Sequence, residues 1–234
     1  MTADHVLVDE VRAVLRAAGD AERAHAQQRY MKSAMPFHGV TSAHLTRLLR
    51  PLYADRRTAD RAAWEDTVRV LWDGATHREE RYAAIALTGH RHYRQWQDPA
   101  ALELYRYLVL TGAWWDYVDD VATHRVAPIL AAYPETVTPR IRTWAREEDM
   151  WIRRTAILSQ LLRKADTDRD LLEDVVRANL ADSRYGHEFF IRKAVGWALR
   201  DFAKTDPGWV GALLDELGDR LSPLSRREAS KHLT

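Results

Sequence analysis

The chain has 234 residues, is 46% hydrophobic, and carries 35 lysine and arginine residues against 34 aspartate and glutamate residues. This length can bury a substantial core, and the formal net charge of +1 neither favours nor excludes a polyanionic partner. The lack of cysteine excludes disulfides, thiolate metal ligands and cysteine nucleophiles. Charges interrupt the stretch from Met1 to Arg23 and no apolar run reaches membrane-spanning length, so we expect a cytoplasmic protein with no membrane partner.

Helix-favouring residues fill the long stretches between glycines and prolines, and the alternation typical of half-buried strands is missing. The sequence therefore predicts an all-α protein. In chain order, helices are expected at 5–18, 21–32, 41–54, 59–73, 77–91, 99–111, 115–132, 137–145, 148–164, 167–180, 187–203, 207–217 and 223–233. Asp98, Asp206 and Ser222 each precede a proline and are expected to cap the helix that follows.

The spacing of these helices predicts successive antiparallel pairs, and a pair of roughly 35 to 45 residues is the unit of a HEAT-like solenoid. We therefore expect a HEAT-like helical-repeat solenoid of stacked antiparallel helix pairs, which would offer a concave face. Because sequence similarity between the pairs is weak, an irregular helical bundle stays open. The absence of a linker or low-complexity tract favours a single domain over residues 1–234.

Paired tryptophans stand beside three carboxylates in the segment from Trp114 to Asp120. Trp115 and Asp119 are four residues apart, so they share a helix face. An inward-facing apolar pattern runs through Val118, Val121, Ala122 and Ile129. This pattern places Asp119 just beside the buried stripe, next to an indole. The alternative is that the acids stabilise the positive end of the helix and the indoles belong to the core.

Two further helices carry residues that a core alone does not explain. In 187–203, the apolar stripe comprises Ile191, Ala194, Val195, Ala198 and Phe202, and a second stripe comprises Lys193, Trp197, Arg200 and Lys204. A solvated basic face explains the cations, but an indole among them is typical of a binding surface, including one for nucleic acid.

In the expected helix 148–164, the inward stripe comprises Trp151, Thr155, Leu158, Leu161 and Leu162. Arg154 lies at its edge, where its planar fork suits a carboxylate or a phosphate. The helix expected after Ser222 begins with basic residues, and its free N–H groups can hold a phosphate.

Motifs for other chemistries are missing or weak. The chain has no glycine-rich phosphate loop, no His-Glu-x-x-His and no nucleophile elbow. Helical spacing puts His90 and His92 on different faces, which favours an exposed polar cluster over a metal site. We therefore expect neither a metal nor a cofactor.

Five motifs stand in order along nearly the whole chain. They are Arg29-Tyr30-Met31-Lys32 with Gly39, Trp114-Trp115-Asp116-x-Val118-Asp119, Trp151-Ile152-x-Arg154-x-Ala156-Ile157-Leu158, Phe189-Phe190-Ile191-x-Lys193-Ala194-x-Gly196-Trp197-x-Leu199-Arg200 and Pro223-Leu224-Ser225-Arg226-Arg227-Glu228-Ala229. Together they resemble the AlkD family of bacterial DNA alkylation-repair glycosylases. The resemblance implies a HEAT-like fold with a concave DNA-binding surface.

The resemblance also implies an activity: a monofunctional, metal-free N-glycosylase that releases cationic N3- or N7-alkylated purines, such as 3-methyladenine and 7-methylguanine, from duplex DNA and so initiates base excision repair. Trp115 and Trp197 match the indoles that contact the deoxyribose of the lesion. Asp119 matches the catalytic carboxylate, and Arg154 matches the arginine that contacts a phosphate. The family attacks the sugar from the backbone side without flipping the base into a pocket.

The expected phosphate contacts of a monomeric protein on duplex DNA are Lys32, Lys193, Arg200, Lys204, Arg226 and Arg227. Thr41 stands where the resemblance leads us to expect a longer polar residue, which leaves the contacts to the opposite strand open. The size of the adduct, from a methyl group to a bulky natural product, and the choice between general repair and self-resistance also stay open. A noncatalytic helical-repeat scaffold that binds DNA structures or a protein is the alternative function.

Overall fold

The computed structural model describes residues 3–233, which form α-helices joined by short 3₁₀ turns, one π-helical turn and loops, without a strand among them. The all-α prediction is confirmed. The chain forms two compact units, which divide between Gln97 and Asp98. A single domain over residues 1–234 stays a prediction. Within the described residues, no helix combines the length and the apolar character needed to cross a membrane.

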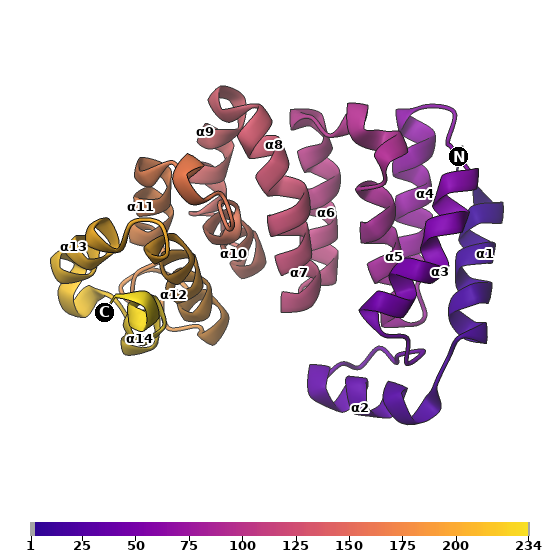
Figure 1. The fold of residues 1–234 in the computed structure, drawn as a ribbon, viewed down its shortest axis with the longest axis horizontal. Helices are drawn as coiled ribbons and strands as arrows, with labels where there is room; N and C mark the ends of the chain where they lie inside the picture. The colour runs from indigo at the N-terminus through magenta and orange to yellow at the C-terminus, as the bar shows by residue number, and fades with distance from the viewer. Residues whose placement is uncertain (1–2, 234) are drawn as a thin grey trace. The chain divides into compact units, whose positions relative to one another are not determined.

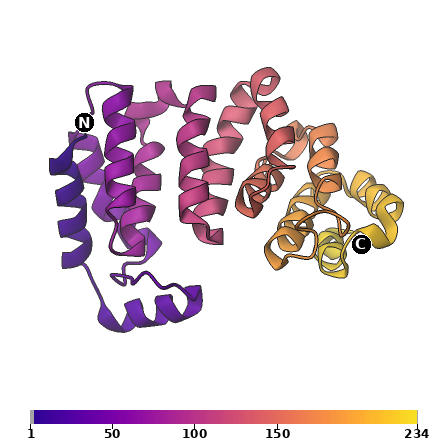
Figure 2. The same ribbon diagram turned by 180° about the vertical axis from the view of Figure 1, so that it is seen from behind.

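Most helices of the first unit lie side by side (Figure 1). The α-helices of this unit are α1 (His5–Ala17), α2 (Ala21–Met31), α3 (Ser42–Asp55), α4 (Arg61–Asp73) and α5 (Arg78–Thr88). Helix α1 packs against α3, α4 and α5, while α2 lies across the ends of the others in both views (Figures 1 and 2). Trp64 of α4 is fully buried, with ring centroids 5.8 Å from Tyr93 and 5.6 Å from Trp96.

The second unit contains nine α-helices among its described residues: α6 (Leu102–Gly112), α7 (Trp115–Val121), α8 (Ala127–Ala132), α9 (Pro134–Trp144), α10 (Met150–Leu158), α11 (Arg169–Arg177), α12 (Phe189–Ala203), α13 (Pro207–Leu217) and α14 (Pro223–Ala229). The helices pack largely on near neighbours in the chain: α6 on α7, α9 on α10 and α11, and α12 on α13 and α14. Local packing of this kind is what a repeat array predicts.

The helix expected at 115–132 runs through α7, a π-helical turn (Ala122–Val126) and α8. Pro128 at the start of α8 has no backbone N–H to donate, which favours a local change in the helical ladder. The predicted inward residues Val118, Val121 and Ala122 are fully buried. The pattern of apolar residues thus located one continuous helix, without any sign of the wider turn within it.

The helix expected at 148–164 is wrong at its C-terminal end, because α10 ends at Leu158. Leu162 and Lys164 have positive φ values of 67° and 54°, which a right-handed helix does not allow. The N–H of Leu162 donates to the Asp201 carboxylate at 2.7 Å, and the Leu162 side chain is 65% exposed. Leu162 therefore does not belong to the inward stripe, whereas Trp151, Thr155, Leu158 and Leu161 are buried as predicted.

The three predicted caps are present. The Asp98 carboxylate accepts from the N–H of Ala100 at 3.0 Å, at the start of a 3₁₀ turn (Pro99–Ala101) that leads into α6. The Asp206 carboxylate accepts from the N–H of Trp209 at 2.9 Å and caps α13. The Ser222 hydroxyl accepts from the N–H of Ser225 at 3.0 Å and caps α14.

Candidate functional site

A largely buried ion pair joins three helices of the second unit. Arg154 on α10 donates from Nε to Oδ1 of Asp119 and from Nη2 to Oδ2, both at 2.7 Å, so the pair is bidentate. Its Nη1 donates to the backbone carbonyl of Phe190 on α12. The side chains of Arg154 and Asp119 are 5% and 14% exposed. The sequence left a carboxylate or a phosphate open as the partner of Arg154, and in the free protein the partner is a carboxylate.

Helix α10 presents Arg154 to this pair because its start is fixed by a cap. The Asp149 carboxylate accepts from the N–H groups of Trp151 and Ile152, both at 2.9 Å. Every residue of α10 from Trp151 to Leu158 is buried, and the helix packs against both α7 and α12. A helix enclosed on several sides holds its arginine at a fixed place between its neighbours.

An aromatic cluster, defined here as Trp114, Trp151 and Phe190, lies beside the ion pair. The ring centroid of Trp114 is 6.1 Å from that of Trp151 and 5.6 Å from that of Phe190, and the last two are 5.0 Å apart. The guanidinium carbon of Arg154 lies 5.9 Å from the Phe190 centroid. The rings exclude water near the pair, so charges there interact more strongly than on an open surface.

The environment of Asp119 changes its acidity. Burial raises the pKa of the Asp119 carboxyl above its ordinary value, and the hydrogen bonds and charge of Arg154 oppose that rise. The carboxylate is thus an anion held in a poorly solvated place by one cation. A carboxyl group with a raised pKa beside an arginine and aromatic rings is typical of a functional site. Structural ion pairs also perturb pKa values in this way.

Trp115 and Trp197, the two indoles assigned to the site from the sequence, lie on the helices that flank α10. Trp115 begins α7, one turn before Asp119. Trp197 lies on α12, the helix whose Phe190 carbonyl accepts from Arg154. Both are half-buried, unlike the fully buried Trp64 and Trp72 of the first unit. The arrangement leaves part of each indole open to a ligand.

The basic stripe of α12 is partly neutralised by an acid on another helix. Glu228 on α14 pairs with Lys193 at 3.1 Å and with Arg200 at 2.7 Å, and it also contacts Lys231 at 2.9 Å. Hydrogen bonds from Lys231 and Lys193 lower the pKa of Glu228 to about 2, against the effect of burial. Lys204 pairs with Asp201 at 3.2 Å. Glu228 belongs to the last of the five motifs, but the sequence did not reveal its pairing with Lys193 and Arg200, because these residues lie on a different helix.

The other residues expected to contact DNA differ in their exposure and in their hydrogen bonds to the protein. Arg226 donates from Nη2 to the carbonyls of Leu214 and Gly218 at 2.7 and 2.9 Å, which ties α14 to the end of α13. Arg227 is exposed. Lys32 is also exposed and ends α2 with a positive φ of 49°. The assignment of all six basic residues to DNA stays a prediction.

Thr41 has a local role in the first unit. Its hydroxyl accepts from the N–H of His44 at 3.3 Å and caps α3. A threonine is suited to this position because its hydroxyl satisfies one of the unpaired N–H groups of the first turn. The cap accounts for the short polar residue that the resemblance did not predict.

The second unit is thus part of an all-α repeat protein in which an acid and an arginine meet under a set of aromatic side chains. The chain belongs to the DNA alkylation repair enzyme family, whose sequence model matches residues 11–233. It is similar to a solved structure described as a predicted DNA alkylation repair enzyme from Enterococcus faecalis, with 32% identity and a TM-score of 0.81. That match covers 92% of this chain and 97% of the other. No curated protein matches this chain. The family indicates an enzymatic role in the repair of alkylated DNA, with DNA as the partner.

Proposed function

We propose that the protein is a monofunctional DNA glycosylase that hydrolyses the N-glycosidic bond of cationic N3- or N7-alkylated purines in duplex DNA. The AlkD-like motifs and the family support this reading. The observation that carries it is Asp119, whose side chain is only 14% exposed and is held by Arg154 between helices that also bear the half-buried Trp115 and Trp197. The protein would act as a monomer in the cytoplasm, on DNA, and initiate base excision repair.

The chemistry follows from the charge of the lesion. An alkylated purine is already a cation, so the C1′–N bond can break with its electron pair passing to the base, which leaves neutral. Positive charge then develops on the sugar. Asp119 supplies a negative charge near it and can orient the water whose oxygen bonds to C1′ and whose proton is released. Little help at the base is needed, which suits a site without a base-reading motif.

Arg154 would control when the Asp119 carboxylate is free to act on the sugar. In the free protein both carboxylate oxygens of Asp119 accept from Arg154, so much of the carboxylate's negative charge is compensated. A phosphate beside the lesion offers the guanidinium an alternative bidentate acceptor. Exchange of the carboxylate for the phosphate would release an oxygen of Asp119 towards the sugar and fix the backbone in register.

The indoles would stabilise the same charge from their faces. Trp115 and Trp197 are half-buried, so each can present a ring to a sugar while the rest of the side chain stays packed. An aromatic face attracts a nearby cation by about 0.5–2 kcal/mol, with more expected where water is excluded. Because the indoles would contact the sugar while it stays in the duplex backbone, the base would not need to flip out of the duplex.

The test is release of free base from a duplex that contains one N7-methylguanine. We expect 7-methylguanine to be released and an abasic strand to remain, while the same duplex with unmodified guanine stays intact. Tight binding to the modified duplex without release of base would overturn the proposal and favour the scaffold. A parallel duplex with a bulky N7 adduct distinguishes small-lesion repair from broad acceptance.

A further inference from the structure

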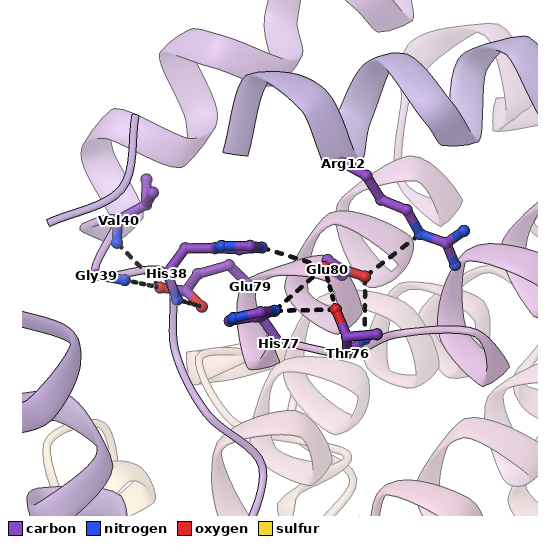
Figure 3. Close-up of polar contacts among 8 residues, drawn as sticks. All are labelled: Arg12, His38, Gly39, Val40, Thr76, His77, Glu79 and Glu80. Carbon is purple, nitrogen blue, oxygen red and sulfur yellow. Dashed lines mark hydrogen bonds and ion pairs between the residues drawn. The ribbon is translucent and has the colours of Figure 1, made fainter. Parts of the chain in front are cut away.

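Two histidines and a glutamate of the first unit converge on one point (Figure 3). His38 lies in the segment between α2 and α3, His77 lies directly before α5, and Glu80 lies in its first turn. The two imidazoles stack with their centroids 3.7 Å apart and an interplanar angle of 12°. The side chains of His38, His77 and Glu80 are 7%, 31% and 3% exposed. The group is therefore largely buried, with one edge open at His77.

The two oxygens of Glu80 have different surroundings. Oε2 accepts from the N–H of Thr76 at 3.1 Å and lies 3.3 Å from Nε of Arg12. Oε1 lies 3.1 Å from Nε2 of His38 and 3.6 Å from Nδ1 of His77. Oε2 is thus held by Thr76 and Arg12, while Oε1 faces both imidazoles. Outer contacts of this kind orient a carboxylate that binds a metal.

The segment that carries His38 is held in place independently of the histidines. The Glu79 carboxylate accepts from the N–H of His38 at 2.9 Å, of Gly39 at 2.8 Å and of Val40 at 2.9 Å. Gly39 has a φ of 88°, and a Cβ there would lie 2.1 Å from the carbonyl oxygen of Asp20. The backbone on both sides of the cluster is therefore fixed before any ligand binds.

We propose that His38, His77 and Glu80 bind a divalent transition-metal ion, Zn²⁺ in the first place. One ring nitrogen of each histidine and a carboxylate oxygen lie within 4.8 Å of one another, the only such three-ligand group among the described residues. A tetrahedral zinc ion with bonds of about 2.0–2.2 Å separates its ligand atoms by roughly 3.3–3.6 Å. Oε1 of Glu80 lies 3.1 Å from Nε2 of His38 and 3.6 Å from Nδ1 of His77, close to this range.

Entry of the ion replaces existing hydrogen bonds. The Thr76 hydroxyl lies 2.9 Å from Nδ1 of His77 and 3.0 Å from Oε1 of Glu80. That hydroxyl would turn away when the ion binds, and the stacked rings would rotate so that one nitrogen lone pair of each points at the ion. Water would complete the fourth position. The ion would then tie the segment at 32–41 to the start of α5. Because the proposed ion takes no part in the proposed reaction at Asp119, zinc binding and glycosylase activity can each fail without the other.

The experiment is a zinc titration of the tag-free full chain, first freed of metal, in competition with a chromophoric chelator at pH 7.5. Variants His38→Gln and His77→Gln remove one ligand each. His92→Gln is the matched control, because His90 and His92 form a second histidine pair, with centroids 4.6 Å apart, that belongs to no three-ligand group in the described part of the chain. His77→Cys offers zinc a replacement ligand.

We expect one zinc per chain, affinity weakened by more than about 100-fold in each Gln variant, and wild-type affinity in His92→Gln. Zinc at about 100 times its dissociation constant should raise the unfolding temperature of the wild type by roughly 5–10 °C and leave that of His77→Gln unchanged. His77→Cys should retain stoichiometric binding. No stoichiometric binding by the wild type, or equal loss in His92→Gln, would overturn the proposal.

Discussion

The carboxylate of Asp119 and the guanidinium of Arg154 constrain each other: the guanidinium affects the protonation of the acid, and the carboxylate occupies the donors of the guanidinium. The arginine favours the ionised form of a largely buried carboxyl group, and the carboxylate occupies two of the three donor positions that the guanidinium uses. A pair of this kind adds little net stability, since desolvation cancels much of the attraction. Its value for this site is that it keeps an anion ready for use in a poorly solvated place.

Replacement of Arg154 should move the acid limb of the pH–rate profile. Asp119 acts as the anion, so its protonation removes activity as the pH falls. Burial raises its pKa from the ordinary 3.8, and Arg154 opposes the rise. Arg154→Gln removes the opposing cation, so the pKa should rise further and the rate should fall at a higher pH than in the wild type. Single-turnover base release across the acidic range measures this shift.

Arg200→Gln is the control for that shift, because Arg200 pairs with Glu228 and not with Asp119. Its acid limb should coincide with that of the wild type. An unchanged limb in Arg154→Gln would show that Asp119 does not titrate in the rate.

The sequence located the members of this site but not their pairing. Asp119 lies beside an apolar helix stripe and Arg154 lies at the edge of another, so each was visible as a polar residue in an apolar setting. They are 35 positions apart in the chain. No periodicity within a single helix reports which residue of a distant helix will face it. The cluster of His38 and His77 was missed for the same reason, since its members share no short motif.

At the scale of elements, α12 and α14 approach closely at one glycine. A Cβ at Gly196 would lie 2.6 Å from Cβ of Glu228 and 2.9 Å from the carbonyl oxygen of Ser225. The second contact is with backbone, which cannot rotate away. The packing that brings Glu228 to the basic stripe therefore depends on the absence of a side chain at this position.

Gly196→Ala should lower the free energy of unfolding by about 1–3 kcal/mol, because the two helices must separate to admit a methyl group. Gly211→Ala on α13 is the matched control, since a Cβ there meets nothing within 4 Å. That control should stabilise the protein by about 0.4–1 kcal/mol through the loss of backbone freedom in the unfolded chain. Chemical denaturation measures the free energy of unfolding of both variants. Equal values would contradict the close approach of α12 and α14 at Gly196.

Helix positions could largely be predicted from apolar spacing and capping residues, and the limits of α13 agree with the prediction at both ends. The end of α10 could not be predicted in this way. Leu161 and Leu162 continue the apolar spacing of α10 beyond its end, but the chain turns there, and the Asp201 carboxylate accepts from the Leu162 N–H. A distant acceptor of this kind leaves no mark on the local sequence.

At the scale of the molecule, acids shield the cations expected to contact DNA. Glu228→Gln should release Lys193 and Arg200, so affinity for undamaged duplex DNA should rise and its salt dependence should steepen. Each further phosphate that the protein neutralises adds about 0.9 to the slope of log affinity against log salt. Asp219→Asn makes the same change in net charge at an exposed residue of the same unit, and its slope should stay close to the wild type. Identical slopes in the two variants would refute the shielding.

The proposed reaction uses water and no lysine amine, so the protein should show no covalent link to its substrate. Borohydride added during turnover on N7-methylguanine DNA should give no protein–DNA adduct. Excess chelator should leave the single-turnover rate at 25 °C unchanged, because the proposed zinc ion acts on stability and not on Asp119. A trapped adduct or a chelator-sensitive rate would require a different mechanism.

Single-turnover release of 7-methylguanine by Asp119→Asn, at saturating enzyme, tests the central role of this carboxylate most directly. The substitution keeps the size of the side chain and removes its negative charge. By analogy with other preorganised electrostatic groups, the rate should fall by about 10² to 10³, or roughly 2.7 to 4 kcal/mol, with binding to undamaged DNA nearly unchanged. Asp116→Asn in the first turn of the same helix should cost much less. A wild-type rate in Asp119→Asn would contradict the assignment, and equal losses in both variants would indicate damage to α7.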